Sequence, residues 1–391
     1  MDDILSDDFQ LPDAYPDGEQ PVEKEYFETI DLLRLVLMLF VSINLFGMRQ
    51  NWFGTGMKIL SGFAPIGFFI ISGFLVLYEC ENTGARILRS IKRTALAFFI
   101  MLVAYFGVNA LFYAIGGINI FAVTPIASKR FWFNFVILNV WPYSIGSLIW
   151  YVQALLYTYV IVYILYRLRL LKYDWLFFLI LFAGVLLTGE FSGLIGFNFF
   201  GAPHLPQGFL TRALPYVLLG SFIRRHLDGL VKVHPIVYIL SALVGILLIP
   251  AEIYVLARTG NLVYIGHLIG MPIVAVSVCM LTFMTMYFQS VQYFYLTDHS
   301  WIYVRVIYYI LQPLSVVLAF AFTAVSTDLF VRMQSWMWIV GFTASFVIAL
   351  AVGVIYDLWT RRRADREELK ELKELVGNVE INDYLEENSD E

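Results

Sequence analysis

Residues Pro65–Glu79 read P-I-G-F-F-I-I-S-G-F-L-V-L-Y-E, and this apolar stretch decides the expected fold. It predicts a membrane helix that carries a seam of small residues, Gly67, Ser72 and Gly73. Small residues let the backbone of a neighbouring helix come close, and a serine can form a hydrogen bond across the interface. The stretch is therefore expected to pack tightly inside a bundle of helices.

The composition indicates that this chain is embedded in a membrane. Of the 391 residues, 60% are hydrophobic and only 15% are charged, which is more apolar surface than a soluble domain can bury. No Asp, Glu, Lys or Arg occurs in residues 94–128 or 259–297. Each run exceeds the roughly 20 residues that a membrane-spanning helix needs. The sequence predicts an all-α polytopic membrane protein.

About ten transmembrane helices are expected, each from an apolar run bounded by charged or turn-forming residues. Their approximate ranges are Phe27–Met48, Met57–Glu79, Thr94–Ile115, Ser147–Tyr166, Trp175–Gly189, Gly208–Ile223, Pro235–Leu256, Leu262–Phe288, Trp301–Thr323 and Met333–Trp359. The stretch Phe131–Val140 is too short to span and is expected to be re-entrant or interfacial.

Three regions follow from this pattern. Residues 1–26 are expected to be a disordered acidic tail, and residues 27–360 the transmembrane domain. Residues 361–391 are expected to form a charged helix and an acidic tail. That helix, Ala364–Leu375, is too short for a coiled coil and is expected to lie on a surface or to bind a protein partner or a second copy of the chain.

The charges are divided between the tails and the body. Residues 1–26 hold nine acidic residues and one basic residue, and residues 361–391 hold eleven acidic and six basic residues, so the remaining body is basic. This division argues against nucleic-acid binding. Placing both termini in the cytoplasm gives the inner loops and tail base fourteen Lys and Arg residues against six outside. The positive-inside rule favours that orientation in the plasma membrane.

Two features exclude other classes. The N-terminus, Met1-Asp2-Asp3, lacks the basic segment of a signal peptide, so no cleavage is expected. The two cysteines, Cys80 and Cys279, indicate neither a disulfide framework nor a metal site.

Short motifs in several helices resemble those of one family. Phe68–Leu75 matches the pattern FF-v-l-SGF-l, and Thr29–Arg34 matches h-l-D-g-L-R. Leu148–Val152 resembles h-l-W-Y-l, and Leu214–Gly220 resembles l-P-y-F-l-l-G. In this order the motifs resemble those of the acyltransferase-3 family of membrane proteins, over most of residues 27–325.

The resemblance implies a reaction. It implies transfer of an acyl group from cytosolic acyl-CoA to a hydroxyl of a sugar or cell-surface glycan, with acyl-CoA as the donor substrate and no tightly bound cofactor. Arg34 and Asn44 are the candidate catalytic residues, and Ser72, Trp150 and Gln153 are the candidate residues for binding substrate. An ionised residue inside the membrane is costly, so Arg34 is a functional candidate in its own right, with Asp31 as its expected structural partner.

The chain departs from the family at both usual histidines. Leu45, beside Asn44, occupies the position of the first, which acts as general base in the family. Leu311, in the stretch Ile307–Pro313, occupies the position of the second. Asn44 can hydrogen-bond a hydroxyl but cannot take its proton near pH 7. Two other histidines, His204 and His267, are candidates to replace the missing general base.

Three interpretations therefore remain, and the first two are an acyltransferase and a catalytically inactive relative that acts in glycan export, sensing or scaffolding. A transporter with a polar substrate route is a third. The donor site is expected at a basic mouth facing the cytosol, because clustered cations bind the phosphate oxygens of coenzyme A. The alternative is that the basic residues of the loops only set the orientation of the chain in the membrane. The mouth comprises Arg86, Arg89, Lys92, Arg93 and Arg305, together with Arg34.

Overall fold

The computed structural model describes residues 21–46, 52–77, 83–116, 129–137, 139, 149–188, 209–258, 268–287, 303–304, 306–311, 314, 317–318, 336–356 and 358–359. Every regular element in these ranges is a helix. The labelled elements are α2 (Pro21–Phe46), α3 (Trp52–Leu60), α4 (Phe63–Val76), α5 (Thr83–Gly116), α6 (Lys129–Trp132), η1 (Phe133–Ile137), α7 (Ile149–Arg167), η2 (Leu171–Tyr173), α8 (Asp174–Thr188), α10 (Phe209–Arg212), α11 (Leu214–Arg225), α12 (Leu227–Leu230), α13 (Pro235–Arg258) and α14 (Gly270–Tyr287). A further helix, without a label, spans Met337–Tyr356.

Five helical stretches among the described residues are long and apolar enough to cross a membrane. They are Gly54–Val76, Thr83–Val108, Ile149–Arg167, Pro235–Arg258 and Met337–Tyr356. Gly270–Thr285 is apolar but shorter. The fold class is that of a helical membrane protein, and the count of ten spans stays a prediction.

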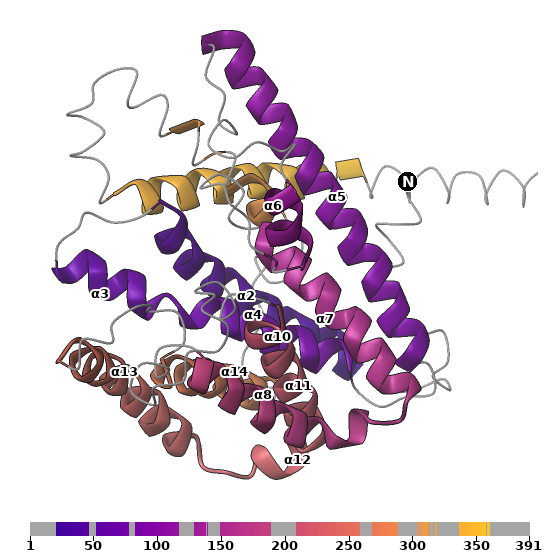
Figure 1. Cartoon of the computed structure of the whole chain (residues 1–391), viewed down its shortest axis with the longest axis vertical. Helices are drawn as coiled ribbons and strands as arrows, with labels where there is room; N and C mark the ends of the chain where they lie inside the picture. The colour runs from indigo at the N-terminus through magenta and orange to yellow at the C-terminus, as the bar shows by residue number, and fades with distance from the viewer. Residues whose placement is uncertain are drawn as a thin grey trace, which may run out of the picture.

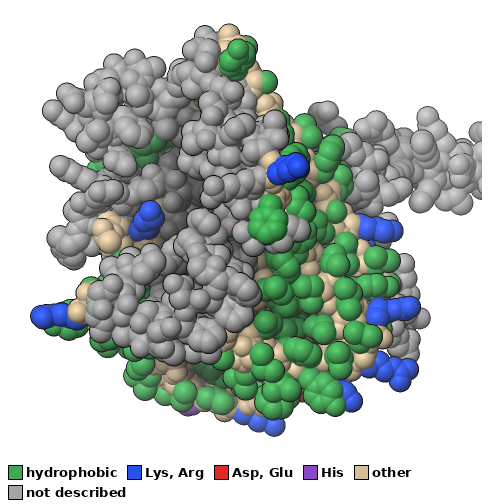
Figure 2. Space-filling view, in the orientation of Figure 1, with side chains coloured by type: hydrophobic (Ala, Val, Ile, Leu, Met, Phe, Trp, Pro, Cys, Tyr) green, Lys and Arg blue, Asp and Glu red, His purple; other side chains and the backbone are tan. Residues whose placement is uncertain are grey.

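The outward faces of these helices support the same assignment. Phe99 on α5 is 62% exposed and Leu247 on α13 is 70% exposed. Figure 2 shows hydrophobic side chains covering the face formed by α5, α7 and α8, with Lys and Arg gathered at its edge. A continuous apolar surface of this kind is the surface that lipid covers.

Helix α4 lies at the centre of the bundle and contacts α2, α5, α11 and α14 (Figure 1). Its crossing with α11 depends on two glycines. A Cβ atom on Gly73 would lie 1.9 Å from the Val217 carbonyl oxygen, and one on Gly220 would lie 2.1 Å from that of Ile70. The expected tight packing is confirmed at Gly73, because no other residue lets the two backbones come this close.

The small residues of α4 do not form a single seam. Gly67 faces α2, where its Cβ position lies 3.0 Å from Leu37, whereas Gly73 faces α11. Ser72 lies near tyrosines of α7. Each small residue therefore admits a different neighbour, which explains how one helix packs against several others.

Several expected helix boundaries were wrong. The stretch Met57–Glu79 is broken by a turn at Ser61–Gly62, because Pro65 has no N–H and its ring crowds the carbonyl four residues earlier. Helix α5 begins at Thr83, eleven residues before the expected Thr94. The loop assigned to Arg86, Arg89, Lys92 and Arg93 is thus helical, since Arg, Lys, Leu and Ile are good or adequate helix formers.

Helices α13 and α14 are joined by a carboxylate that the sequence analysis did not identify. The buried Glu252 of α13 accepts hydrogen bonds from the backbone N–H groups of Ile269 at 3.1 Å and Gly270 at 3.4 Å. These donors lie at the start of α14, where no intrahelical acceptor exists. A glutamate of one helix thus caps the next, which explains why a charged residue is kept inside an apolar segment.

Candidate functional site

The site is built around an ion pair on α2. The Arg34 Nη1 atom donates to Asp31 Oδ1 at 2.7 Å, one helical turn away. The Asp31 side chain is 5% exposed and that of Arg34 is 21% exposed. The expected partnership is confirmed. Because both charges lie largely away from solvent, the pair is held by its own geometry and by polar neighbours.

Those neighbours come from α4 and α7. The Ser72 hydroxyl donates to the Phe68 carbonyl oxygen at 2.8 Å and interacts with the hydroxyls of Tyr151 and Tyr159. The Arg34 charge acts on both tyrosines. We call these five residues, Asp31, Arg34, Ser72, Tyr151 and Tyr159, the Arg34 cluster.

Aromatic rings enclose the cluster. The ring centroid of Tyr151 lies 4.6 Å from that of Phe69 and 6.1 Å from that of Tyr308. Trp150 packs edge-on against Phe69 at 6.1 Å, and the Arg212 guanidinium carbon lies 5.4 Å from the Trp150 ring centre. The polar groups are thus surrounded by apolar surface, which strengthens electrostatic interactions within the cluster.

Gln153 lies near Trp150 but makes a different set of contacts. Its Nε2 atom donates to the Phe135 carbonyl oxygen at 2.6 Å and to the Tyr157 hydroxyl at 3.1 Å. Asn139 Nδ2 donates in the same region to the Trp150 carbonyl oxygen at 3.2 Å. These amides bridge α7 to the segment around η1, so Gln153 belongs to that junction and is not one of the groups that meet Ser72.

The four basic residues of the expected mouth lie in the first three turns of α5. Arg89 and Lys92 are exposed, whereas Arg86 and Arg93 are partly buried. A Cβ atom on Gly84 would lie 2.8 Å from the Tyr166 ring, so this end of α5 packs beside the C-terminal end of α7. The basic residues therefore share one end of the α5–α7 pair, while Tyr151 lies near the other end of α7.

Some predicted residues lie outside the described part of the chain. These are Arg305, His204, His267 and the side chains of Asn44 and Leu45. Of the two family histidine positions, the structure describes Leu311, which is fully buried in the hydrophobic core. The two histidines among the described residues, His226 and His234, are exposed.

No protein-family model, no curated protein and no solved structure matches this chain. Within the described ranges, no group of three or more His, Cys, Asp or Glu residues is placed to hold a metal ion.

Sequence reasoning missed three features of functional interest. The first is the pair Tyr151 and Tyr159, which complete the Arg34 cluster. Both are polar residues within an expected membrane span, and Tyr151 also lies in one of the family-like motifs, so these signals were available in the sequence. Glu252 is an ionisable residue in an expected span and the same rule identifies it. The third, an ion pair between Asp174 and Arg225, joins residues that no local pattern connects.

The chemistry available to the Arg34 cluster is that of a fixed cation with flanking hydroxyl groups. A guanidinium stays protonated at all accessible pH values and offers several N–H donors in one plane. Tyrosine and serine hydroxyls can both donate and accept. Such a set can stabilise an oxyanion or hold a polar substrate, and it contains no group that takes up a proton readily near pH 7.

Proposed function

We propose that the chain is an acyltransferase-3-like membrane protein that transfers an acyl group from cytosolic acyl-CoA to a hydroxyl of a sugar or cell-surface glycan. What supports the proposal is the convergence of the motifs that suggested it. Arg34, Ser72 and Tyr151 come from three separate motifs and meet in one buried cluster. Tyr308, from the stretch around the second family histidine position, packs on Tyr151.

The fourth motif, Leu214–Gly220, lies against helix α4. Leu214–Gly220 lies on α11, whose Gly220 packs against the α4 backbone at Ile70. Motifs that are far apart in the sequence therefore surround α4. Packing alone explains apolar contacts between helices, but it does not require a charged residue beside three hydroxyl groups at the meeting point.

In the proposed reaction the acceptor hydroxyl attacks the thioester carbonyl. A carbon–oxygen bond forms, the carbon–sulfur bond breaks, and the hydroxyl proton ends on the thiol of coenzyme A. Arg34 would stabilise the oxyanion that develops on the carbonyl oxygen, and the hydroxyls of Ser72 and Tyr151 would orient the reactants. Asn44, Trp150 and Gln153 remain candidates for holding the acceptor.

A second candidate is a catalytically inactive relative that acts in glycan export, sensing or scaffolding. The observation that favours it is the burial of Leu311 in the core, where the family has a histidine. A positioned general base contributes typically 10²–10⁴-fold to rate. An active enzyme must therefore rely on positioning and charge stabilisation, or on His204 or His267.

The donor site is tested by binding. We expect purified wild-type protein to bind acyl-CoA, and Arg86→Gln with Arg89→Gln to weaken binding by roughly 10²-fold or more, because each lost charge-assisted contact costs about 1.5–3 kcal/mol. Isothermal titration calorimetry measures both values.

The matched control is Lys58→Gln with Arg258→Gln, which removes two basic residues expected on the opposite side of the membrane. It should leave acyl-CoA binding unchanged. Absence of acyl-CoA binding by folded wild-type protein would contradict a cytosolic donor site. Equal losses of binding in the two double variants would mean that the basic residues of α5 serve only to set the topology.

The proposed setting is the plasma membrane, with both termini cytoplasmic.

A further inference from the structure

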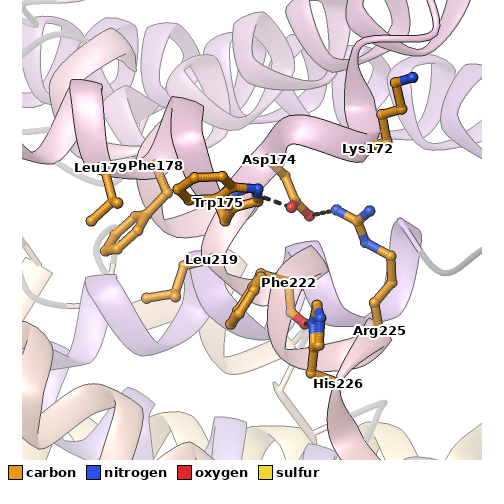
Figure 3. A pocket seen from close by; sticks show the side chains of 9 residues that line it. All are labelled: Lys172, Asp174, Trp175, Phe178, Leu179, Leu219, Phe222, Arg225 and His226. Carbon is orange, nitrogen blue, oxygen red and sulfur yellow. Dashed lines mark hydrogen bonds and ion pairs between the residues drawn. The ribbon is translucent and has the colours of Figure 1, made fainter.

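A second site lies between the start of α8 and the end of α11, away from the Arg34 cluster. The residues there line a cleft of about 620 Å³ (Figure 3). The lining residues are Lys172, Asp174, Trp175, Phe178, Leu179, Leu219, Phe222, Arg225 and His226.

One end of the cleft is charged and rigidly built. The Asp174 carboxylate forms an ion pair with Arg225 and also accepts the Trp175 backbone N–H at 2.7 Å. Arg225 Nη2 donates to the Leu171 carbonyl oxygen at 3.0 Å. These contacts fix the η2 turn to the end of α11. The Asp174 side chain is 1% exposed, so its charge is matched by Arg225 and not by water.

Lys172 and His226 flank this pair. Lys172 is exposed, with its Nζ atom 4.8 Å from the centre of the Tyr173 ring. The His226 Nδ1 atom lies 3.0 Å from the Phe222 carbonyl oxygen, which leaves Nε2 as the nitrogen available to a ligand. The lining contains two cations, Lys172 and Arg225, and one carboxylate, so it carries one net positive charge with histidine neutral. That balance suits a ligand with a single negative charge.

The other end of the cleft is apolar. Figure 3 shows Trp175, Phe178 and Leu179 of α8 opposite Leu219 and Phe222 of α11. Leu179 is 50% exposed, and on the same helix Ile180 is 60% exposed. The apolar end therefore continues onto the outward surface that lipid covers. Trp175 and Tyr173, both exposed beside basic residues, are typical of the membrane interface.

We propose that this cleft binds one anionic phospholipid, with its phosphate beside Lys172 and an acyl chain between Phe178 and Leu219. The amphipathic lining matches both ends of such a molecule. Coenzyme A carries several phosphate charges, and one net positive charge does not balance them. The site is independent of the proposed acyl transfer, because it shares no residue with the Arg34 cluster or with the basic residues of α5.

The test counts bound lipid by native mass spectrometry of the purified full-length protein in mixed micelles. The probes are phosphatidylglycerol, phosphatidylcholine and glycerol 3-phosphate. Wild type should retain phosphatidylglycerol preferentially. Lys172→Gln should weaken phosphatidylglycerol binding about tenfold, because a charge-assisted contact is lost. It should weaken phosphatidylcholine binding less, because the choline cation already offsets the phosphate charge of that lipid. Leu219→Trp, which fills the apolar end, should weaken retention of both lipids.

Arg169→Gln is the matched control, because Arg169 is a basic residue of the same connection that does not line the cleft. Arg169→Gln should retain both lipids as wild type does. Only variants whose melting temperature equals that of wild type are compared. Equal retention of the two lipids by wild type, or an equal loss in Arg169→Gln, would overturn the proposal. If glycerol 3-phosphate bound as tightly as the lipid, the acyl chain would contribute nothing to binding, and the proposed contact between Phe178 and Leu219 would be wrong. Displacement of the lipid by acyl-CoA at equal concentration would assign the cleft to the donor instead.

Discussion

Replacing Gly220 by alanine should destabilise the protein by about 3 kcal/mol or more, and Gly73→Ala should do the same. The added methyl group would lie 2.1 Å from the Ile70 carbonyl oxygen in the first case and 1.9 Å from that of Val217 in the second. Backbone atoms cannot rotate away as a flexible side chain can, so α4 and α11 must separate. A thermal unfolding scan in detergent should show a large fall in melting temperature.

Gly107→Ala is the control for this effect. Gly107 lies on α5, and nothing lies within 4 Å of its Cβ position. The same substitution there should be neutral or stabilise the helix by up to about 1 kcal/mol, because alanine is the better helix former. Equal melting temperatures for Gly220→Ala and Gly107→Ala would mean that the α4–α11 crossing is looser than the structure places it.

The second large effect is expected at the ion pair of α2. Arg34→Ala should destabilise the protein by about 3–5 kcal/mol, because it removes the cation beside a buried carboxylate. Asp31, at 2.7 Å from Arg34 and 5% exposed, would lose this cation and then either hold an uncompensated charge or take up a proton, and both cost stability. Unfolding measured by melting temperature should place Arg34→Ala well below wild type, with Arg34→Lys between them.

A double-mutant cycle isolates this interaction. Asp31→Asn combined with Arg34→Ala should cost less than Arg34→Ala alone, since the unpaired charge is then absent. Arg89→Ala, which removes an exposed arginine of α5, should change the melting temperature little. Strict additivity of the two α2 substitutions would contradict the view that each residue neutralises the other.

The parts of the structure that depend on near neighbours in the sequence were predictable. The Asp31–Arg34 pair follows from a three-residue spacing on a helix, which places two side chains on one face. The apolar run around α4 predicted a helix, and its glycine predicted a close crossing. The partner of that crossing, α11, lies more than a hundred residues away, and no pattern within α4 identifies it.

Charge was a poor guide to where helices end. Arg86 and Arg93 mark the limit of an apolar run, and the sequence analysis took that limit for the end of the helix. A helix that leaves the membrane continues through good helix formers, so α5 extends to Thr83. Hydropathy locates the membrane-spanning part of a helix, whereas capping and turn residues locate its ends.

The full composition of the candidate site could not be derived from the sequence. Ser72 and Arg34 were identified, but Tyr159 joins them only because the fold brings its hydroxyl on α7 to the Ser72 hydroxyl of α4. The bridge from Gln153 to Phe135 similarly depends on where the segment around η1 folds back. Such contacts follow from tertiary packing, which single-sequence periodicity does not specify.

The most direct test of the account measures label transfer from radiolabelled acetyl-CoA to candidate glycan acceptors. Membranes should hold equal amounts of folded wild type, Arg34→Lys or Lys58→Gln. The account predicts transfer by wild type, a loss of roughly 10²-fold or more in Arg34→Lys, which keeps the charge but loses the planar set of donors, and unchanged transfer in Lys58→Gln. Absence of transfer from folded wild type to any acceptor, or full activity of Arg34→Lys, would contradict an acyltransferase centred on Arg34.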